Sequence, residues 1–189
     1  MEEKIRLVIG CHASAAQALA DKWAVIAQIA SVVAGTLRKG GRVLVCGNGG
    51  SAADSQHIAA ELVGRFKLER RALSAIALTT DTSILTSLSN DYSYDQVFAR
   101  QVEAHGRPGD VVIGLSTSGA SPNVLKALQK AREMRLTTVG LLGRDGGVIK
   151  PACDMALVIE NADTPRVQEM HILAAHIVCE LVEASLASD

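Results

Sequence analysis

Leu44 to Phe66 read LVCGNGGSAADSQHIAAELVGRF, in which a short aliphatic run is followed by a glycine-rich turn and then by a helical pattern. The aliphatic residues up to Cys46 predict a strand, and Gly47 to Gly50 predict a tight turn. Ser51 stands at the position expected of a helix N-cap. Because backbone N–H groups at a helix N-terminus attract anions, this segment predicts a cradle for a negatively charged group.

The rest of the chain repeats this alternation of strand and helix. Aliphatic runs of strand length lie at 42–46, 75–78, 111–115, 138–142 and 155–159, and helical patterns lie at 51–65, 82–88, 93–105, 122–134 and 166–186. The alternation predicts an α/β fold, a three-layer αβα sandwich around a five-stranded, mostly parallel sheet. Such a sheet places the loops after its strands at one common edge, where ligands usually bind.

The N-terminal residues predict a helix of unusual length. From Glu2 to Leu37, apolar residues recur at three- and four-residue steps, which is typical of an amphipathic helix. We expect the 189 residues to form a single domain, 1–189, in which 1–37 are a helical segment for oligomerisation.

Composition excludes several classes of function. The chain has 19 Lys and Arg against 20 Asp and Glu, a net charge of -1, so no general attraction to nucleic acid or to anionic membranes is expected. The cysteines, Cys11, Cys46, Cys153 and Cys179, are widely spaced and favour reduced, mostly buried thiols over a zinc ribbon or redox motif. With no signal-peptide pattern and no apolar run of ~20 residues, we expect a cytoplasmic protein.

A second polar loop follows the strand that ends near Leu115. Ser116 to Ser121 read STSGAS, and Pro122 opens the next helix. Its hydroxyls and nearby N–H groups could surround a phosphate without any Lys or Arg. A capped turn without a ligand is the alternative for either loop alone, whereas two such loops at one sheet edge favour ligand binding. Neither a dinucleotide fingerprint nor a Walker A loop is present, so nucleotide binding is disfavoured.

Two pairs of polar residues lie on predicted helices. His57 and Glu61 are four positions apart and therefore share a helix face, and Gln168 and His176 are a little over two turns apart on the last helix. Either pair alone is more often a solvated helix contact than half of a metal site, and spacing does not show that the pairs meet. His171 is interpreted as a satisfied polar residue.

Four motifs in order carry a resemblance to a known family. They are CGNGGSAADSQHIAAELVGRF at 46–66, SNDYSYD at 89–95, STSGASPNV at 116–124 and RVQEMHILAAH at 166–176. Together they resemble the phosphoheptose isomerases of the sugar isomerase (SIS) domain superfamily, over nearly the whole chain. The resemblance implies a cytoplasmic homotetramer that converts D-sedoheptulose 7-phosphate to D-glycero-D-manno-heptose 7-phosphate, in the synthesis of ADP- or GDP-heptose precursors for lipopolysaccharide and other bacterial surface glycans.

The resemblance also assigns residues. It implies one zinc ion per subunit with the ligands His57, Glu61, Gln168 and His176. It implies sugar-phosphate contacts by Asn48, Gly49, Gly50, Glu61, Asn90, Asp91, Ser116, Thr117, Ser118, Ser121 and Gln168, and we add Ser51 from its place in the first loop. Ala120 stands where the family often has Asn, so details of the sugar contact are expected to differ.

Isomerisation between a ketose and an aldose moves a proton between C1 and C2 through an enediol. Glu61 is the candidate base at carbon and His176 the candidate acid at oxygen, although the two roles could be reversed. Zinc would act as a Lewis acid, and a residue that ligates it is a poorer base at that moment. The alternatives are a non-catalytic SIS-fold tetramer that binds a replication initiator protein and a sugar-phosphate sensor. The presence of Glu61 and His176 favours the isomerase.

Overall fold

A single parallel sheet organises the molecule. The structure is a computed structural model that describes residues 1–187, and in this part of the chain the strands are β1 (Val43–Cys46), β2 (Ala75–Ala77), β3 (Val111–Ser116), β4 (Thr137–Gly143) and β5 (Met155–Ile159). Their order across the sheet is β2-β1-β3-β4-β5, and every neighbouring pair is parallel. All five strands were predicted, and none of their ends differs from the prediction by more than one residue.

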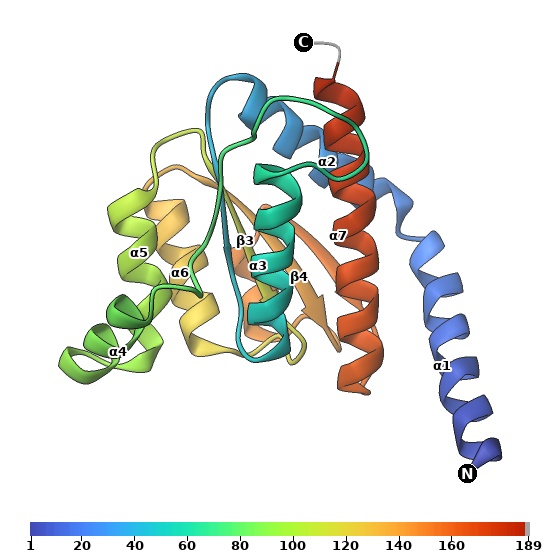
Figure 1. Cartoon of the computed structure of the whole chain (residues 1–189). Helices are drawn as coiled ribbons and strands as arrows, with labels where there is room; N and C mark the ends of the chain where they lie inside the picture. Colours follow the sequence, from blue (N-terminus) through green and yellow to red (C-terminus); the bar gives the residue numbers. More distant parts are fainter. Residues whose placement is uncertain (188–189) are drawn as a thin grey trace.

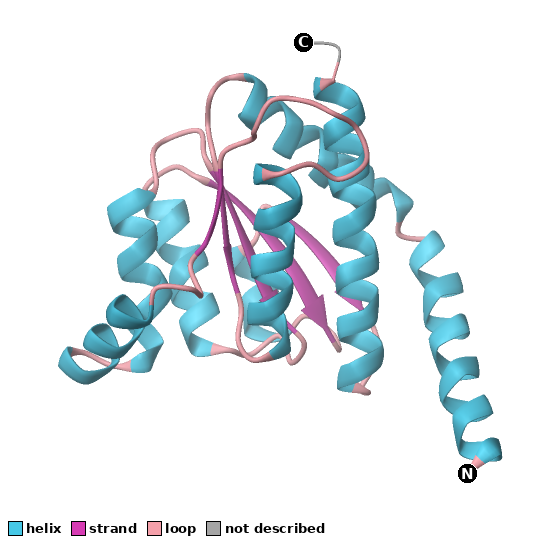
Figure 2. Ribbon diagram, viewed as in Figure 1, coloured by secondary structure: helices cyan, strands magenta, loops and turns pink. Residues whose placement is uncertain are grey.

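Helices cover both faces of this sheet (Figures 1 and 2). They are α1 (Glu2–Ala20), α2 (Trp23–Arg38), α3 (Gly50–Val63), α4 (Thr82–Asp91), α5 (Val97–His105), α6 (Pro122–Glu133) and α7 (Thr164–Leu186), with short 3-10 turns η1 (Tyr94–Gln96) and η2 (Gly147–Ala152). Val43 and Val45 pack with α2, α3 and α7, whereas Leu44 and Cys46 pack with α5 and α6 on the opposite face. Because the strands are buried on both faces, they are continuously aliphatic. The predicted three-layer αβα sandwich is confirmed.

The N-terminal segment differs from the single long helix that the sequence predicts. It is divided at Asp21 and Lys22 into α1 and α2, whose axes are bent by 69°. The N–H of Lys22 donates to the Leu19 carbonyl, three residues earlier, which tightens the chain into a turn. Apolar residues recur at three- and four-residue steps in both helices. The periodicity therefore continues across the bend and does not reveal it.

The two N-terminal helices have different surroundings. α2 lies in the core, where Ile29 and Val33 are buried. α1 extends away from the sheet beside α7 (Figure 1), and its Ile5, Leu7 and Ile9 are exposed. In residues 1–187 no single helix is long and apolar enough to span a membrane. Only α1 and α2 taken together, as a bent pair, reach that length and apolarity.

Candidate active site

The first loop after β1 turns sharply into α3. Gly49, with φ +57°, is the N-cap, so α3 begins at Gly50. Ser51 is therefore not the N-cap that the sequence predicts but a buried residue in the first turn, because the left-handed conformation at Gly49 lets the helix start earlier. A Cβ at Gly50 would collide with the amide of Gln168, so this glycine admits a side chain of α7 against the start of α3.

Two asparagines join the first loop to the second. The Asn48 amide donates to Asn123 Oδ1 at 2.9 Å, and the Asn123 amide donates to Asn48 Oδ1 at 2.8 Å. Asn123 is buried in the first turn of α6, and its Oδ1 also accepts the Val124 N–H. The Tyr94 hydroxyl reaches Asn48 Oδ1 at 3.3 Å. Both predicted cradles are thus held against each other at the carboxyl edge of the sheet.

Hydroxyl groups converge within the second loop. Ser116 Oγ lies 2.9 Å from Ser121 Oγ and 3.4 Å from Ser118 Oγ. Ser121 is the N-cap of α6, but its side chain does not cap the helix, so its hydroxyl is directed to Ser116. Gly119 has φ +67° and packs on the backbone of Gly146 and Gly147, where a Cβ would not fit. The result is a compact, uncharged cup of hydroxyls at a helix N-terminus, the kind of site that accepts a phosphate.

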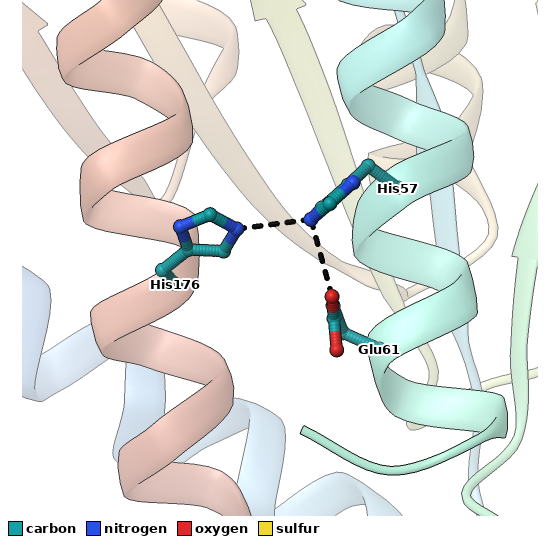
Figure 3. Close-up of side chains that lie close together, drawn as sticks. All are labelled: His57, Glu61 and His176. Atoms are coloured by element: carbon teal, nitrogen blue, oxygen red, sulfur yellow. Dashed lines mark hydrogen bonds and ion pairs between the residues drawn. The ribbon is translucent and has the colours of Figure 1, made fainter. Parts of the chain in front are cut away.

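Side chains from α3 and α7 converge between the two helices (Figure 3). His57 Nε2 lies 3.1 Å from Glu61 Oε1 on the same helix and 2.9 Å from His176 Nε2 on α7. The two imidazole rings are tilted by 57° with centroids 5.0 Å apart. The structure therefore brings the predicted pair His57 and Glu61 together with His176 of the other predicted pair.

This cluster fits a metal ion by its donor set. One ligand atom from each of His57, Glu61 and His176 lies within 4.8 Å of the others. Two imidazole nitrogens and a carboxylate oxygen are common zinc ligands, and a catalytic zinc site typically has three protein ligands and an open position. The donor atoms of His57, Glu61 and His176 are thus close enough together to hold one metal ion.

Gln168 and Asp54 lie beside the cluster. The Gln168 amide packs on Gly50 and interacts with the Asp54 carboxylate. Burial raises the pKa of Asp54, against the opposing effects of the hydrogen bond from Gln168 and of the positive charge that His57 and His176 carry when protonated. Asp54 Oδ2 is buried without a hydrogen-bond partner among the described residues. A hollow of about 310 Å³ adjoins Asp54 and Gln168.

Three other residues predicted to contact the substrate, Asn90, Asp91 and Thr117, lie outside the cluster of His57, Glu61 and His176. Asn90 and Asp91 are exposed at the end of α4, where the Asn90 amide donates to Asp91 Oδ1. Thr117 is half-buried, and its carbonyl packs closely against Gly143 at the end of β4. A wider hollow of about 800 Å³ lies between α1 and the connection after β5, and it contains none of the predicted site residues.

His171 departs from its interpretation as a satisfied polar residue. Its side chain is fully buried, and neither ring nitrogen makes a hydrogen bond with the residues of the described chain. Burial lowers the pKa of His171 to about 4, and the nearby Leu142 carbonyl, which does not reach hydrogen-bond geometry, opposes this only in part. The ring is therefore neutral at neutral pH and belongs to the buried interior of the protein.

Several residues around the site were not singled out from the sequence. Asn123 stands inside the motif STSGASPNV, yet nothing in the spacing of two asparagines 75 positions apart indicates that their amides meet. Phe66, whose ring stacks on His176 at 5.5 Å, ends the first motif and reads as a core residue. Asp54 lies three positions before His57 on the same helix face, so helical spacing alone could have identified it as a neighbour of His57.

Comparisons with known proteins give consistent matches. Residues 11–143 match the SIS domain. A phosphoheptose isomerase of Pelobacter propionicus is 62% identical over 161 residues, 85% of this chain and 85% of the relative. Another, from Geobacter sp., is 54% identical over 187 residues, 98% of this chain and 97% of the relative. The solved structure of a phosphoheptose isomerase from Neisseria gonorrhoeae has a TM-score of 0.92 at 41% identity, over 97% of this chain and 98% of that chain.

Proposed function

The chain belongs to the SIS-domain family and, within it, to the phosphoheptose isomerases, and from this premise we propose that it converts D-sedoheptulose 7-phosphate to D-glycero-D-manno-heptose 7-phosphate. It is an aldose–ketose isomerase of heptose biosynthesis. The observation that carries the proposal is the approach of His57 and Glu61 on α3 to His176 on α7, beside two loops suited to a sugar phosphate.

The substrate would lie across the carboxyl edge of the sheet. Its phosphate would be held by Ser116, Thr117, Ser118 and Ser121 and by the N-terminus of α6, where hydroxyls and N–H groups need no lysine or arginine. The sugar would contact Asn48, Gly49, Gly50, Ser51, Asn90, Asp91 and Gln168. Because the amides of Asn48 and Asn123 join the two loops, the phosphate end and the sugar end would be held in a fixed relation.

Glu61 would take the proton from C1 of the ketose, which leaves an enediolate with its charge on the oxygen at C2. His176 would donate a proton to that oxygen, and return of a proton to C2 with loss of the proton on the C1 oxygen would complete the aldose. Each group is expected to contribute ~10²- to 10⁴-fold to the rate, as general acids and bases usually do. The same two residues could exchange these roles.

One zinc ion per subunit is part of the proposal, with His57, Glu61 and His176, whose ligand atoms lie together, as ligands. Gln168 is the fourth ligand that the resemblance implies. When bound, zinc would polarise the substrate carbonyl and stabilise negative charge on oxygen. The remaining chemistry belongs to the protein, since Glu61 and His176 would hold and move the protons, with Asp54 close to the Gln168 amide.

We also propose the assembly and setting that the resemblance implies. The chain would form one SIS-type domain, 1–189, and a homotetramer through residues 1–37, whose exposed apolar residues on α1 favour association. It would act in the cytoplasm and supply heptose for lipopolysaccharide. Binding to a replication initiator as a non-catalytic tetramer finds no support in the comparisons.

One assay tests the proposed reaction. Purified protein is incubated with sedoheptulose 7-phosphate and, separately, with sedoheptulose, and aldose formation is followed with zinc supplied. We expect product from the phosphorylated sugar and far slower turnover of the free sugar, because the second loop would bind only the phosphate. Absence of turnover of both sugars would count against the isomerase.

A further inference from the structure

The Glu183 carboxylate of α7 accepts several hydrogen bonds from the loop between α3 and β2, residues 64–74. Glu183 accepts hydrogen bonds from the N–H groups of Phe66 at 2.9 Å, Lys67 at 2.6 Å and Leu68 at 2.8 Å. Burial raises the pKa of Glu183, but these three donors and Arg70 outweigh it and hold the pKa below its usual range. The carboxylate is therefore charged and fully engaged at neutral pH.

Arg70 connects the same carboxylate to α3. Its Nε lies 3.3 Å from Glu183 Oε1, with only 3% and 2% of the two side chains exposed. Its Nη2 donates to the Glu61 carbonyl at 2.7 Å, and its Nη1 donates to the Gly64 carbonyl at 3.1 Å. One buried ion pair thus ties α7 to the backbone of the very residue that supplies the candidate base.

The loop also sets the surroundings of His176. Phe66, whose N–H is held by Glu183, stacks its ring on the His176 imidazole with centroids 5.5 Å apart and planes 29° apart. A second ion pair between the same loop and helix, Lys67 with Glu180, is different in kind, because its side chains are 56% and 52% exposed. Exposed pairs of this type contribute little, so it offers a matched control.

We propose that Arg70 and Glu183 are positioning residues for the isomerase: they fix the separation of α3 and α7 and hold Phe66 against His176, so that Glu61 and His176 meet the substrate in one geometry. This role rests on the proposed function. A displacement of ~1 Å in such a group can cost ~10²-fold in rate, which gives a buried clamp of this kind a measurable effect on turnover.

The test compares Glu183→Gln with the control Glu180→Gln. We expect kcat of Glu183→Gln to fall by ~10- to 100-fold with KM within about threefold of wild type, since binding through the distant loops is kept. Glu180→Gln should keep both constants. Equal kcat values for the two variants would overturn the proposal.

A second measurement does not depend on activity or metal. In metal-free protein, the His176 ring protons should show a ring-current shift from Phe66 by NMR, and this shift should be lost in Glu183→Gln and kept in Glu180→Gln. If wild type is inactive, the proposed function fails, and the NMR comparison alone tests whether Glu183 holds Phe66 against His176. An unchanged His176 resonance in Glu183→Gln would overturn that role.

Phe66→Leu serves if Glu183→Gln does not fold. It removes the ring while the backbone N–H groups still reach Glu183, so the fold should persist. We expect the same loss of the ring-current shift together with a reduced kcat, and a wild-type kcat in this variant would contradict the role assigned to Phe66.

Discussion

The Nε2 atoms of His57 and His176 lie 2.9 Å apart, although 119 positions separate the two residues in the chain. Two imidazole nitrogens at this distance share a proton or a cation, because two lone pairs facing each other repel. Glu61 Oε1, 3.1 Å from His57, adds a negative charge to the same point. The arrangement suits a divalent metal ion.

Zinc should stabilise the folded protein through this cluster. Zinc at ~100 times its dissociation constant should add ~2.7 kcal/mol to the free energy of unfolding, which raises the melting temperature. His57→Ala should abolish most of this increase, whereas His105→Ala, at the end of α5, should retain it. Calorimetry with and without zinc measures the effect. An equal zinc response in the two variants would remove His57 from the ligand set.

The hydroxyl cup of Ser116, Ser118 and Ser121 should determine substrate affinity by binding the phosphate group of the substrate. Ser121→Ala removes one hydroxyl of the Ser116 and Ser121 pair, and a hydrogen bond to a charged group is worth ~1.5–3 kcal/mol, so KM should rise ~10-fold or more. Inhibition by inorganic phosphate should weaken in parallel. Ser83→Ala in α4 is the control. If KM and phosphate inhibition both stay at wild-type values, the cup does not hold the phosphate.

Asn48 and Asn123 should be energetically coupled. Each amide both donates to and accepts from the other, so either single change to Ala leaves a partner unsatisfied, and that partner is buried in the case of Asn123. A double-mutant cycle on the free energy of unfolding should give a coupling of at least ~0.5 kcal/mol. The control pair is Asn48→Ala with Asn161→Ala; Asn161 lies beyond β5, which two strands, β3 and β4, separate from β1. Additive effects in the Asn48 and Asn123 cycle would show that the amide pair is not formed.

His171 should make stability depend on pH. Its pKa is about 4 in the folded protein and ~6.5 when unfolded, so the unfolded chain binds more protons between these values. The free energy of unfolding should therefore fall as pH is lowered through this window, by ~2 kcal/mol between about pH 7 and about pH 5. Urea unfolding of metal-free wild type and His171→Gln, at one protein concentration, measures the difference. Parallel pH profiles would mean that the folded ring accepts a proton freely.

The strands were predictable because a parallel sheet covered on both faces needs continuous aliphatic runs. Val45 and Cys46 face opposite layers, yet both positions demand an apolar residue, so the run reads as a strand in the sequence. The bend at Asp21 and Lys22 was not predictable in this way, since no glycine or proline marks it. Ser51 was misplaced because several turn-forming residues precede it, and only the φ of Gly49 decides which of them caps α3.

The site was predictable in parts. Periodicity shows that His57 and Glu61 share a helix face, but it does not show which helix lies opposite, so resemblance alone paired them with His176. The hydroxyl cup could be anticipated because its residues are contiguous. The contacts of Asn123 with Asn48 and of Glu183 with Phe66 join distant segments through single polar groups, and such contacts leave no periodic signal.

Glu61 and His176 are the two groups that would move protons in the proposed reaction. Wild type, Glu61→Gln, His176→Gln and the control His105→Gln should be compared with sedoheptulose 7-phosphate as substrate and zinc supplied. We predict aldose formation by wild type and the control, and a kcat lower by ~10²- to 10⁴-fold in each of the other two variants. Wild-type turnover in Glu61→Gln and in His176→Gln would show that these two residues do not move the protons.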